Sequence, residues 1–271
     1  MNHLRRELAP ILASAWQLIE DEARDALKTY LAARKFVDFS GPHGFSHAAV
    51  NLGRTESLKF DHGPADGHVL ETRLRKVAPL MELRVPFELS LAELDDVDRG
   101  ASDVELDAVV AAARALARAE DRAVFYGVQG ASIEGIVTGS SHEPLALGND
   151  FKNLADCVSV AIARLRTAGV DGPYGLALDA HAYTAMLQTT GPGGYPVLQH
   201  LRRFVEGPTI WAPSLDGALV FSMRGGDFEL VVGEDISVGY RGHSQDKVQL
   251  YLEETFTFRL LGPEAAVVLC T

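Results

Sequence analysis

Apolar side chains recur every three or four positions between Pro10 and Arg34, which predicts an amphipathic helix. Proline suits the first turn of such a helix, because its missing N–H would have no partner there. Charged side chains between Glu20 and Lys28 occupy the opposite face, so we expect the apolar stripe to dock on the rest of the fold. The stripe consists of Leu12, Trp16, Ile19, Ala23, Leu27, Tyr30 and Leu31.

Two β-like stretches follow, at residues 48–58 and 68–76, and a turn-rich segment at residues 61–67 separates them. We interpret these stretches as a long hairpin with residues 61–67 at its tip. A two-stranded hairpin is at best marginally stable in water, so we expect it to lie against another surface, such as another subunit. A further strand is expected at residues 80–89.

The next pattern predicts one long helix. Ser102 and Glu105 have the spacing of a capping box, in which each side chain accepts a free N–H of the first helical turn. Apolar residues continue at helical spacing to Tyr126, and Gly127 can end the helix. A helix of about 24 residues is roughly 36 Å long, which indicates a structural spine.

The remaining segments interleave helices and strands, which favours an α+β fold. Arg224–Asp227 signals a hairpin between strands at residues 219–222 and 228–232. Alternating apolar and polar residues predict a long strand over residues 248–260, with a slip at Glu253–Glu254. Helices are expected at residues 149–168, 180–188 and 196–205, with a strand at residues 174–178 and an uncharged loop at residues 189–195.

Charge and composition narrow the classes of function. The 271 residues carry a formal net charge of −12, whereas a nucleic-acid binder needs Lys and Arg to displace counterions from phosphates. Cys157 and Cys270 are too few for a disulfide framework, and we expect both to be reduced. No stretch approaches the ~20 apolar residues of a membrane span, and the N-terminus lacks a clean signal peptide. We therefore expect a soluble, cytoplasmic protein without nucleic-acid or membrane partners.

The histidines offer only weak metal sites. His43 and His47 are four residues apart, a spacing that binds metal on a helix, but the glycines and proline around them disfavour a helix. His62 and His68 flank two aspartates at the predicted hairpin tip, where a solvated loop is the better interpretation. The sequence has neither an HExxH motif nor paired CxxC motifs. We expect no metal and no cofactor.

Nucleophilic and phosphate-binding motifs are also weak. Ser140–Glu143 places Ser, His and Glu side by side, whereas a catalytic triad is built from separated positions. Gly191–Gly194 lacks the Walker lysine, so a tight loop is the better interpretation. The acidic cluster around Asp95, Asp96 and Asp98 is interpreted as a solvated turn or a subunit contact. These patterns do not favour an enzyme.

An ordered set of short motifs resembles the encapsulin family (family 1), also described as linocin-like bacteriocins. Each motif is weak alone, but together they run in order along essentially the whole chain, which makes the resemblance specific. The motifs are Leu8–Pro10, Trp16, Arg34–Asp38, Gly41–Gly44, Leu94–Gly100, Glu120–Asp121 with Phe125, Ile133–Ile136, Gly169–Tyr174, Arg224–Phe228, Ser237–Tyr240 and Glu253–Phe258.

The resemblance implies a tailed-phage major capsid-like fold, with a P-domain, an A-domain and an extended E-loop hairpin. It also implies a closed icosahedral shell of about sixty copies of the chain, because repeated heterologous contacts must close to avoid open filaments. On this plan the P-domain comprises residues 1–47, 77–132 and 224–260, the E-loop residues 48–76, and the A-domain residues 133–223 with a last strand at residues 261–271.

Family members enclose cargo enzymes, such as ferritin-like iron-oxidising proteins or dye-decolorising peroxidases, which bind through a C-terminal targeting peptide. The resemblance therefore implies a shell without catalytic activity that serves iron storage or the response to oxidative stress. The residues that the resemblance implies for peptide binding are Leu27, Tyr30, Leu31, Arg34, Asp38, Leu230 and Tyr240. The alternative is that these residues have only structural roles: the leucines pack the helix onto its own domain, and Arg34 pairs with Asp38.

The resemblance also places an uncharged loop at a fivefold pore, which implies a pore without strong electrostatic selection. Two other functions stay open. A prophage-type major capsid protein would have the same fold, but the negative charge and the N-terminal helix disfavour it. A peptidase or bacteriocin is disfavoured because no nucleophile or metal motif is present. The loop comprises Thr189, Thr190, Gly191, Pro192, Gly193, Gly194 and Tyr195.

Overall fold

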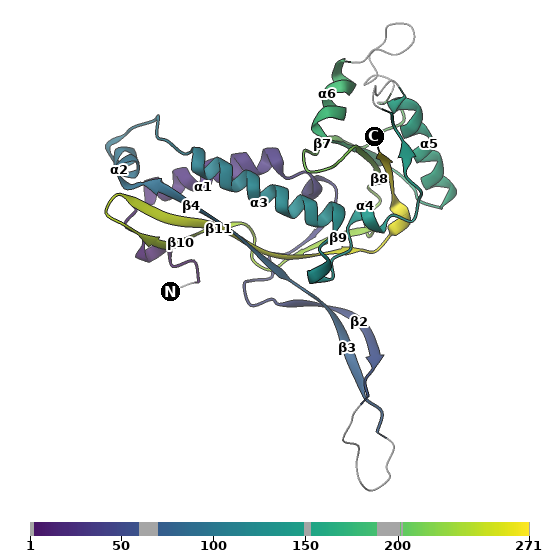
Figure 1. Ribbon diagram of the computed structural model, residues 1–271, viewed down its shortest axis with the longest axis horizontal. Coiled ribbons are helices and arrows are strands. Elements are labelled where there is room, and N and C mark those ends of the chain that lie inside the picture. Colours follow the sequence, from purple (N-terminus) through teal and green to yellow (C-terminus); the bar gives the residue numbers. More distant parts are fainter. Residues whose placement is uncertain (1–2, 60–69, 149–152, 189–200, 202, 271) are drawn as a thin grey trace.

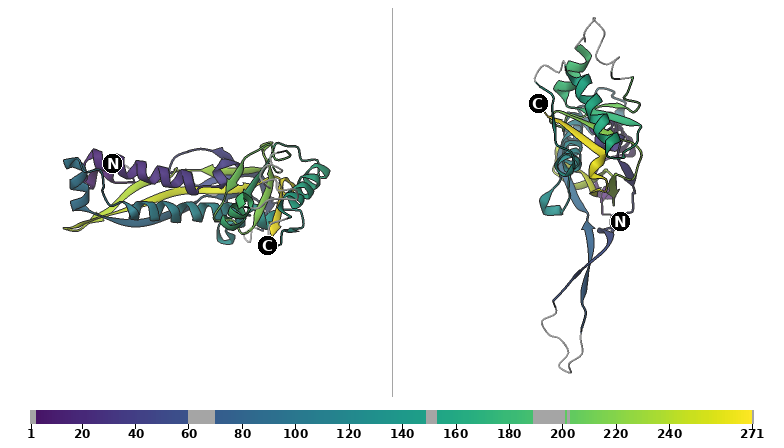
Figure 2. Two further views of the ribbon diagram at one scale, coloured as in Figure 1. Left: turned by 90° about the horizontal axis from the view of Figure 1, so that it is seen from above. Right: turned by 90° about the vertical axis from the view of Figure 1, so that its right-hand side faces the viewer.

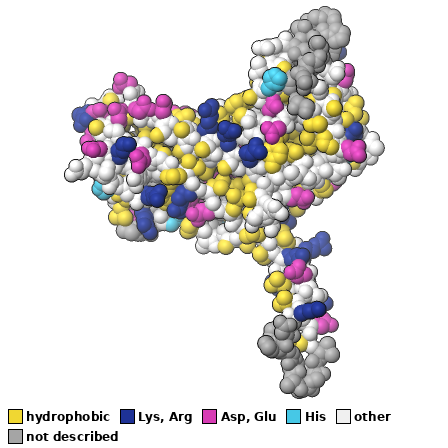
Figure 3. All heavy atoms as spheres, viewed as in Figure 1, with side chains coloured by type: hydrophobic (Ala, Val, Ile, Leu, Met, Phe, Trp, Pro, Cys, Tyr) yellow, Lys and Arg dark blue, Asp and Glu magenta, His cyan; other side chains and the backbone are white. Residues whose placement is uncertain are grey.

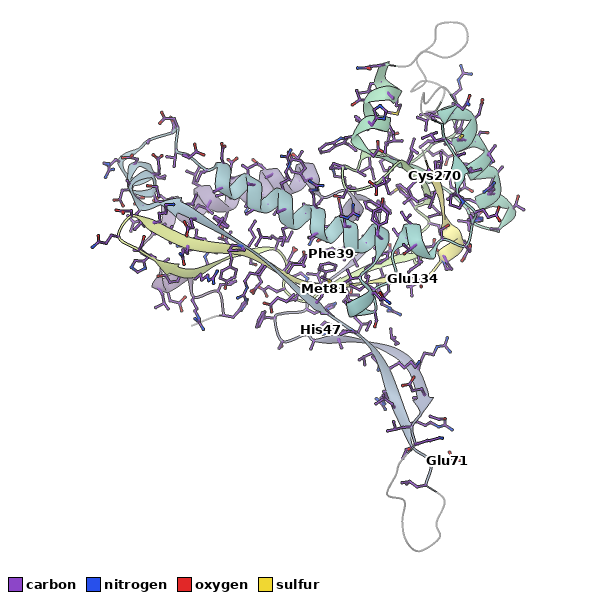
Figure 4. All side chains as sticks on the ribbon, viewed as in Figure 1. Phe39, His47, Glu71, Met81, Glu134 and Cys270 are labelled. Atoms are coloured by element: carbon purple, nitrogen blue, oxygen red, sulfur yellow. The ribbon has the colours of Figure 1, made fainter. Side chains whose placement is uncertain are left out.

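The computed structural model describes residues 3–59, 70–148, 153–188, 201 and 203–270. The chain forms an elongated body with a compact lobe at one end, and a two-stranded hairpin projects from the body (Figures 1 and 2). Helices and strands alternate along the sequence, which confirms the predicted α+β class. The predicted domain boundaries stay a prediction.

A first sheet forms the elongated body around one long strand, β11 (Lys247–Leu260). β4 (Met81–Ser90) runs antiparallel along one edge of β11, and β10 and β9 follow one another along the other edge. β1 pairs parallel with β9 at the outside. These three strands span Ser237–His243 (β10), Phe228–Val232 (β9) and Asp38–Ser40 (β1).

Helices α1 (Ala13–Tyr30) and α3 (Asp107–Tyr126) lie side by side over one face of this sheet (Figures 1 and 2). Their apolar stripes share a buried cluster with β4, β10 and β11, so the predicted docking of the first helix is confirmed. Its predicted start at Pro10 was wrong. The chain before α1 is bound to β10, because the Leu4 carbonyl accepts the Tyr240 N–H at 2.8 Å. A short 3-10 turn, η1 (Arg6–Leu8), follows, and Ala9 and Leu12 then have extended backbone conformations, so the helix begins only at Ala13.

A second sheet forms the compact lobe in the strand order β5-β12-β8-β6-β7. Every residue of β6 (Tyr174–Leu178) and β8 (Ala218–Ser222) is buried, which is typical of strands covered on both faces. The main hydrophobic core includes these strands and residues of α5 and α6. The other bounds are Leu145–Ala146 (β5), Ala266–Cys270 (β12), Thr209–Trp211 (β7), Leu154–Thr167 (α5) and Ala180–Gln188 (α6).

The projecting hairpin pairs β2 (Ala49–Ser57) with β3 (Arg73–Pro79) in antiparallel register, as predicted. Its tip, residues 61–67, lies outside the described residues. Most side chains of both strands are exposed, so neither face of the hairpin is covered by its own chain. Short elements join the larger ones: η2 (Ala33–Lys35), η3 (Gln129–Ala131), α4 (Ile136–Gly139) and η4 (Pro263–Ala265).

The predicted start of the spine helix at Ser102 was wrong, because α3 begins at Asp107. Glu105 still provides a partner for a free backbone N–H of the first turn of α3, since its carboxylate accepts the Asp107 N–H at 3.0 Å. Before it lies a helix that the sequence did not predict, α2 (Leu91–Arg99), which ends at Gly100 with φ 98°. The acidic cluster interpreted as a turn therefore lies on a helix.

The predicted hairpin between β8 and β9 was also wrong, because the two strands belong to different sheets. β8 pairs with β6 and β12, whereas β9 pairs with β1 and β11. Gly225 and Gly226 adopt φ 82° and 81°, and Arg224 holds Asp227 through an ion pair of 2.8 Å. This tight link carries the chain from one sheet to the other instead of folding it back.

No slip occurs at Glu253–Glu254, because β11 keeps one register against β4 from Lys247 to Phe256. Buried and exposed residues stop alternating along β11 for another reason: residues 250–258 are all buried, including side chains on both faces of the strand. The predicted helix at residues 196–205 falls mostly outside the described residues, as does the start of the one at residues 149–168. Among the described residues, no helix is both long and apolar enough to cross a membrane.

Candidate functional site

A groove of about 540 Å³ runs along α1, between that helix and the segment that leads from β9 into β10. It brings together residues from the N-terminal segment, α1, η2, β10 and β11, which are far apart in the sequence. Three of the predicted peptide-binding residues, Leu27, Leu31 and Arg34, line it. The full lining is Arg6, Glu20, Ala23, Arg24, Leu27, Lys28, Leu31, Arg34, Lys35, Asp235, Ile236, Ser237, Val238 and Leu252.

The apolar part of this groove comes from two directions. Ala23 and Leu27 are one helical turn apart on α1, so they share a face of that helix. Ile236, Val238 and Leu252 come from the opposite wall. The leucine and valine side chains are largely buried, so the groove offers their exposed edges as an apolar surface of limited area. Such a surface can accept small or branched apolar side chains of an extended peptide.

Arg34 lines the groove and is held by three carboxylates. Its Nε donates to Glu120 at 2.8 Å, and its Nη1 donates to Asp235 at 2.8 Å. Its Nη2 also pairs with Glu254. Burial lowers the pKa of Arg34, but the carboxylates beside it, with Glu120 first, more than offset this, so the net shift is upward. The guanidinium is therefore committed to the chain itself.

Two buried carboxylates share this single cation. Glu120 and Glu254 are both fully buried. Burial raises the pKa of Glu254 well above its usual range, and the neighbouring Glu120 raises it further. Burial and a neighbouring carboxylate both disfavour the charged form of a carboxyl group, so Glu254 holds its proton more strongly than an exposed glutamate does. The cluster thus joins α3, β11 and η2 through charge-assisted hydrogen bonds to Arg34, which itself lines the groove.

Asp121 fixes the turn that carries Arg34. Its carboxylate accepts the backbone N–H of Ala32 at 3.0 Å and of Ala33 at 2.9 Å, which satisfies donors at the start of η2. Burial raises the pKa of Asp121 to about 7, against the lowering effect of the Ala33 N–H. Arg34 therefore leaves the end of α1 in a fixed direction.

The other predicted peptide-binding residues lie outside the groove lining. The Tyr30 ring lies 5.7 Å from Trp211 and beneath the Arg114 guanidinium. Exposed Asp38 accepts the Gly226 N–H at 2.6 Å, so the alternative pairing of Arg34 with Asp38 was wrong. Leu230 is fully buried, and Tyr240 is mostly buried with its hydroxyl bonded to His243. The predicted pore loop, residues 189–195, lies outside the described residues.

The weaker candidate catalytic and metal-binding residues, Ser140, His142, His43 and His47, make hydrogen bonds or ring contacts within the fold. The Ser140 hydroxyl donates to the Ala266 carbonyl at 2.8 Å, and His142 Nε2 lies 3.0 Å from the Glu264 carbonyl, so these neighbours do not face one another as a triad. The rings of His43 and His47 are 4.9 Å apart, and His43 is bonded to Ser40. In the described part of the chain, no three His, Cys, Asp or Glu residues gather as metal ligands.

Sequence reasoning missed the wall opposite α1 and the partners of Arg34. Asp235, Ile236 and Val238 sit in a turn and strand that no local motif links to α1. One signal was present: Glu253–Glu254 interrupts a long apolar strand pattern. A charge in such a position calls for a buried partner of opposite sign.

The chain matches the Linocin_M18 family, described as encapsulating protein for peroxidase, over residues 1–257. It is 54% identical to the type 1 encapsulin shell protein of Rhodospirillum rubrum, over 99% of this chain and 96% of the relative. It is 46% identical to the type 1 encapsulin shell protein of Mycobacterium tuberculosis, over 99% of both chains.

Solved structures share the fold at low sequence identity. A virus-like particle protein from Pyrococcus furiosus superposes with a TM-score of 0.65 and 20% identity, over 93% of this chain and 98% of the other. A protein of Mycobacterium phage Bobi gives a TM-score of 0.57 and 15% identity, over 89% and 90%. The predicted capsid-like fold is therefore confirmed. With its sequence matched over nearly the full length, the chain belongs to the family of type 1 encapsulin shell proteins.

Proposed function

We propose that this chain is the structural subunit of a closed, hollow protein shell that encloses a cargo enzyme. One observation carries the proposal: a helix-on-sheet body, a compact lobe and an uncovered hairpin combine in a single chain (Figure 1). The same architecture occurs in a virus-like particle protein. A heterologous interface repeated with closure gives a shell of about sixty copies in the smallest icosahedron.

The groove along α1 supports a place for the cargo. An extended tail could lay apolar side chains against Leu27, Leu31, Ile236 and Val238. Arg34 would not bind the tail through its charge, because three carboxylates of its own chain already hold it. It would instead keep the Asp235 turn against the end of α1 and so maintain the width of the groove.

The family description supports a class of cargo. The family's model is described as an encapsulating protein for peroxidase, which favours a peroxidase as cargo. The encapsulin resemblance implies that such a cargo is a dye-decolorising peroxidase with a C-terminal targeting peptide. A ferritin-like iron-oxidising protein is the second class implied by the encapsulin resemblance. Either cargo would give the shell a role in oxidative stress or iron storage in the cytoplasm, without catalysis by the shell itself.

Negative-stain electron microscopy of the chain expressed alone tests the shell. Uniform hollow icosahedral particles, with no nucleic-acid absorbance at 260 nm, are expected. Particles filled with DNA would favour a prophage-type capsid protein instead. A monodisperse monomer or small oligomer at micromolar concentration would overturn the proposal.

A further inference from the structure

Residues 3–8, which we call the strap, run from the edge of the first sheet to the side of α1. β10 is the last strand on its side of this sheet, so its outer edge pairs with no other strand among the described residues. The N-terminal end of the chain lies beside β10 (Figure 1), and the Leu4 carbonyl accepts the Tyr240 N–H at 2.8 Å. An open strand edge presents such backbone groups to any extended segment. The strap therefore covers part of an edge that would otherwise be available for pairing.

The other end of the strap reaches the groove along α1. Arg6 pairs with Glu20 of α1, and its guanidinium lies 4.3 Å from the centre of the Trp16 ring. Arg6 and Glu20 both line the groove. Both side chains are partly exposed, and ion pairs near the surface contribute little to stability. This contact therefore joins the strap to the groove without holding it firmly.

The backbone of the strap is strained at Arg5. This residue has φ 52° and ψ 29°, in the left-handed region that residues other than glycine rarely adopt. Such a conformation persists only where the surrounding contacts hold it. Leu4 anchors the strap on one side, because its side chain is buried. The contacts that precede Leu4 then decide how firmly the strained segment is held.

A buried carboxylate faces the start of the strap. Glu253 of β11 is fully buried, and its Oε1 accepts no hydrogen bond among the described residues. His3 Nε2 lies 3.3 Å from that oxygen and 3.8 Å from Glu234 Oε1, and the imidazole stacks on Phe45 with ring centres 3.9 Å apart. A buried charge is costly unless an opposite charge lies beside it. Protonated His3 supplies that charge, whereas neutral His3 does not.

The other charges near this site leave the role to His3. Arg84 of β4 pairs with the second oxygen of Glu253, but it is 47% exposed and also pairs with Glu82 at 3.1 Å. Three carboxylates thus stand against two guanidiniums, and a protonated imidazole balances the set. Histidine is the side chain whose charge ordinarily changes between pH 5 and 8. The charged groups on the strap and on the elements packed against it are Arg5, Glu82, Arg84, Glu234 and Glu253.

We propose that residues 3–8 form a pH-sensitive strap beside the groove, which is closed when His3 is protonated and opens when His3 is neutral. Closure compensates Glu253 and covers the edge of β10. Opening exposes that edge and takes Arg6 out of the groove lining. The inference rests on the proposed binding of a cargo tail in the groove and adds a way in which that binding is regulated.

Hydrogen–deuterium exchange of assembled shells at pH 5.5 and pH 8, on either side of the usual titration of histidine, tests the strap. The Tyr240 amide reports closure directly, because it donates to the Leu4 carbonyl. After correction for the intrinsic effect of pH on exchange, its protection is expected to fall about tenfold at pH 8, as for the loss of one charge-assisted contact. Amides in the middle of α3 should keep their protection at both values. Equal protection of Tyr240 at the two pH values would overturn the proposal.

Two substitutions separate the charge of His3 from its polarity. His3→Gln keeps a polar side chain without a charge and is expected to be open at both pH values, whereas His3→Lys stays positively charged and closed. His142→Gln, in the compact lobe, is the matched control and should respond to pH as the wild type does. A pH response that survives in His3→Gln shells would also overturn the strap.

Loading at a single pH separates the strap from the cargo function. Shells of each variant are assembled around a fluorescent protein that carries the C-terminal tail of a dye-decolorising peroxidase. His3→Gln shells are expected to load several times more of it than His3→Lys shells, because Arg6 no longer occupies the groove. Equal loading of the two variants would overturn control of the groove by the strap. Absence of loading in every shell, wild type included, would instead overturn the proposed cargo site.

Discussion

Arg34 is a mostly buried cation that lines the groove along α1. Its guanidinium is bonded to two fully buried carboxylates, Glu120 and Glu254, and to the half-exposed Asp235. Removing the cation from a buried ion pair lowers the stability of the fold by more than the intact pair contributes, because the buried carboxylates are left without a positive charge beside them. Arg34 therefore acts first on stability, and an effect of its substitution on cargo would be indirect.

Substitution of Arg34 by methionine is expected to destabilise the chain by about 3–5 kcal/mol. Adding Glu120→Gln and Glu254→Gln to Arg34→Met should restore most of the loss, since no buried charge then lacks a partner. Arg24→Met is the matched control, because Arg24 pairs with Asp21 at the exposed surface of α1 and such pairs contribute under about 1 kcal/mol. Thermal unfolding midpoints measure all three, and equal midpoints for the Arg34 and Arg24 variants would contradict this role.

The raised pKa of Asp121 predicts that the stability of the fold depends on pH. Its pKa is raised from 3.8 to about 7 by burial, so its stabilising protonated form is fully present below pH 3.8 and is lost as the pH rises through 7. Asp121→Asn keeps an oxygen for the Ala33 N–H but does not titrate. From pH 4 to pH 7 the wild type should lose up to about 4 kcal/mol relative to this variant.

Unfolding midpoints measured at pH 4.5 and pH 7 check the difference. Asp25→Asn, at an exposed position of α1, is the control and should follow the wild type at both values. Parallel curves for wild type and Asp121→Asn would show that Asp121 does not titrate in this range.

At the scale of elements, glycines mark where α3 and α5 end. Gly127 follows α3 with φ 79° and ψ 174°, a conformation open almost only to glycine. A Cβ there would also lie 2.4 Å from the Ile133 carbonyl. Gly169 follows α5 with φ 77°, but a Cβ there would meet nothing within 4 Å. The two positions thus share a positive φ and differ in the space around them.

Gly127→Ala is therefore expected to cost several kcal/mol, and Gly169→Ala only about 1–2 kcal/mol from the backbone conformation. Denaturant unfolding of both variants measures the difference. Equal losses would mean that the contact with Ile133 relaxes freely.

Local patterns located most of these elements. The bounds of β6 and α6 match the predictions, and the ends of α3 and α5 follow from their glycines. The helix α2 was missed because acidic residues dominate it and only Leu94 is fully buried, so its apolar stripe is faint. Asp107 replaces Ser102 as the start of α3 because the segment between them is tied to α2: the Glu105 N–H donates to Glu93 at 3.2 Å.

At the scale of the whole molecule, the groove along α1 gives a test of cargo binding. Ile236→Asp puts a charge on the apolar wall opposite α1, at a partly buried position. Loading of a fluorescent protein that carries the C-terminal tail of a dye-decolorising peroxidase is expected to fall about tenfold. That factor corresponds to 1.4 kcal/mol, within the range for losing one buried apolar contact.

Val160→Asp on α5 is the matched control, because Val160 is 47% exposed and lies outside the groove lining. Electron microscopy confirms that both variants form particles before loading is compared. Undiminished loading of intact Ile236→Asp shells would exclude this wall from the binding site, and a ferritin-like tail tested in parallel would show which cargo the wild type accepts.

The fold class, the projecting hairpin, the spine helix and the family could all be predicted before the structure was known, because local periodicity, glycine positions and ordered motifs indicate each of them. Two features became visible only in the folded chain: β8 and β9 belong to different sheets, and Arg34 pairs with Glu120, Asp235 and Glu254. Those partners lie 86, 201 and 220 residues away from Arg34. The physical reason is that local patterns fix which face of an element is apolar, whereas the pairing of distant faces depends on how the connecting turns direct the chain.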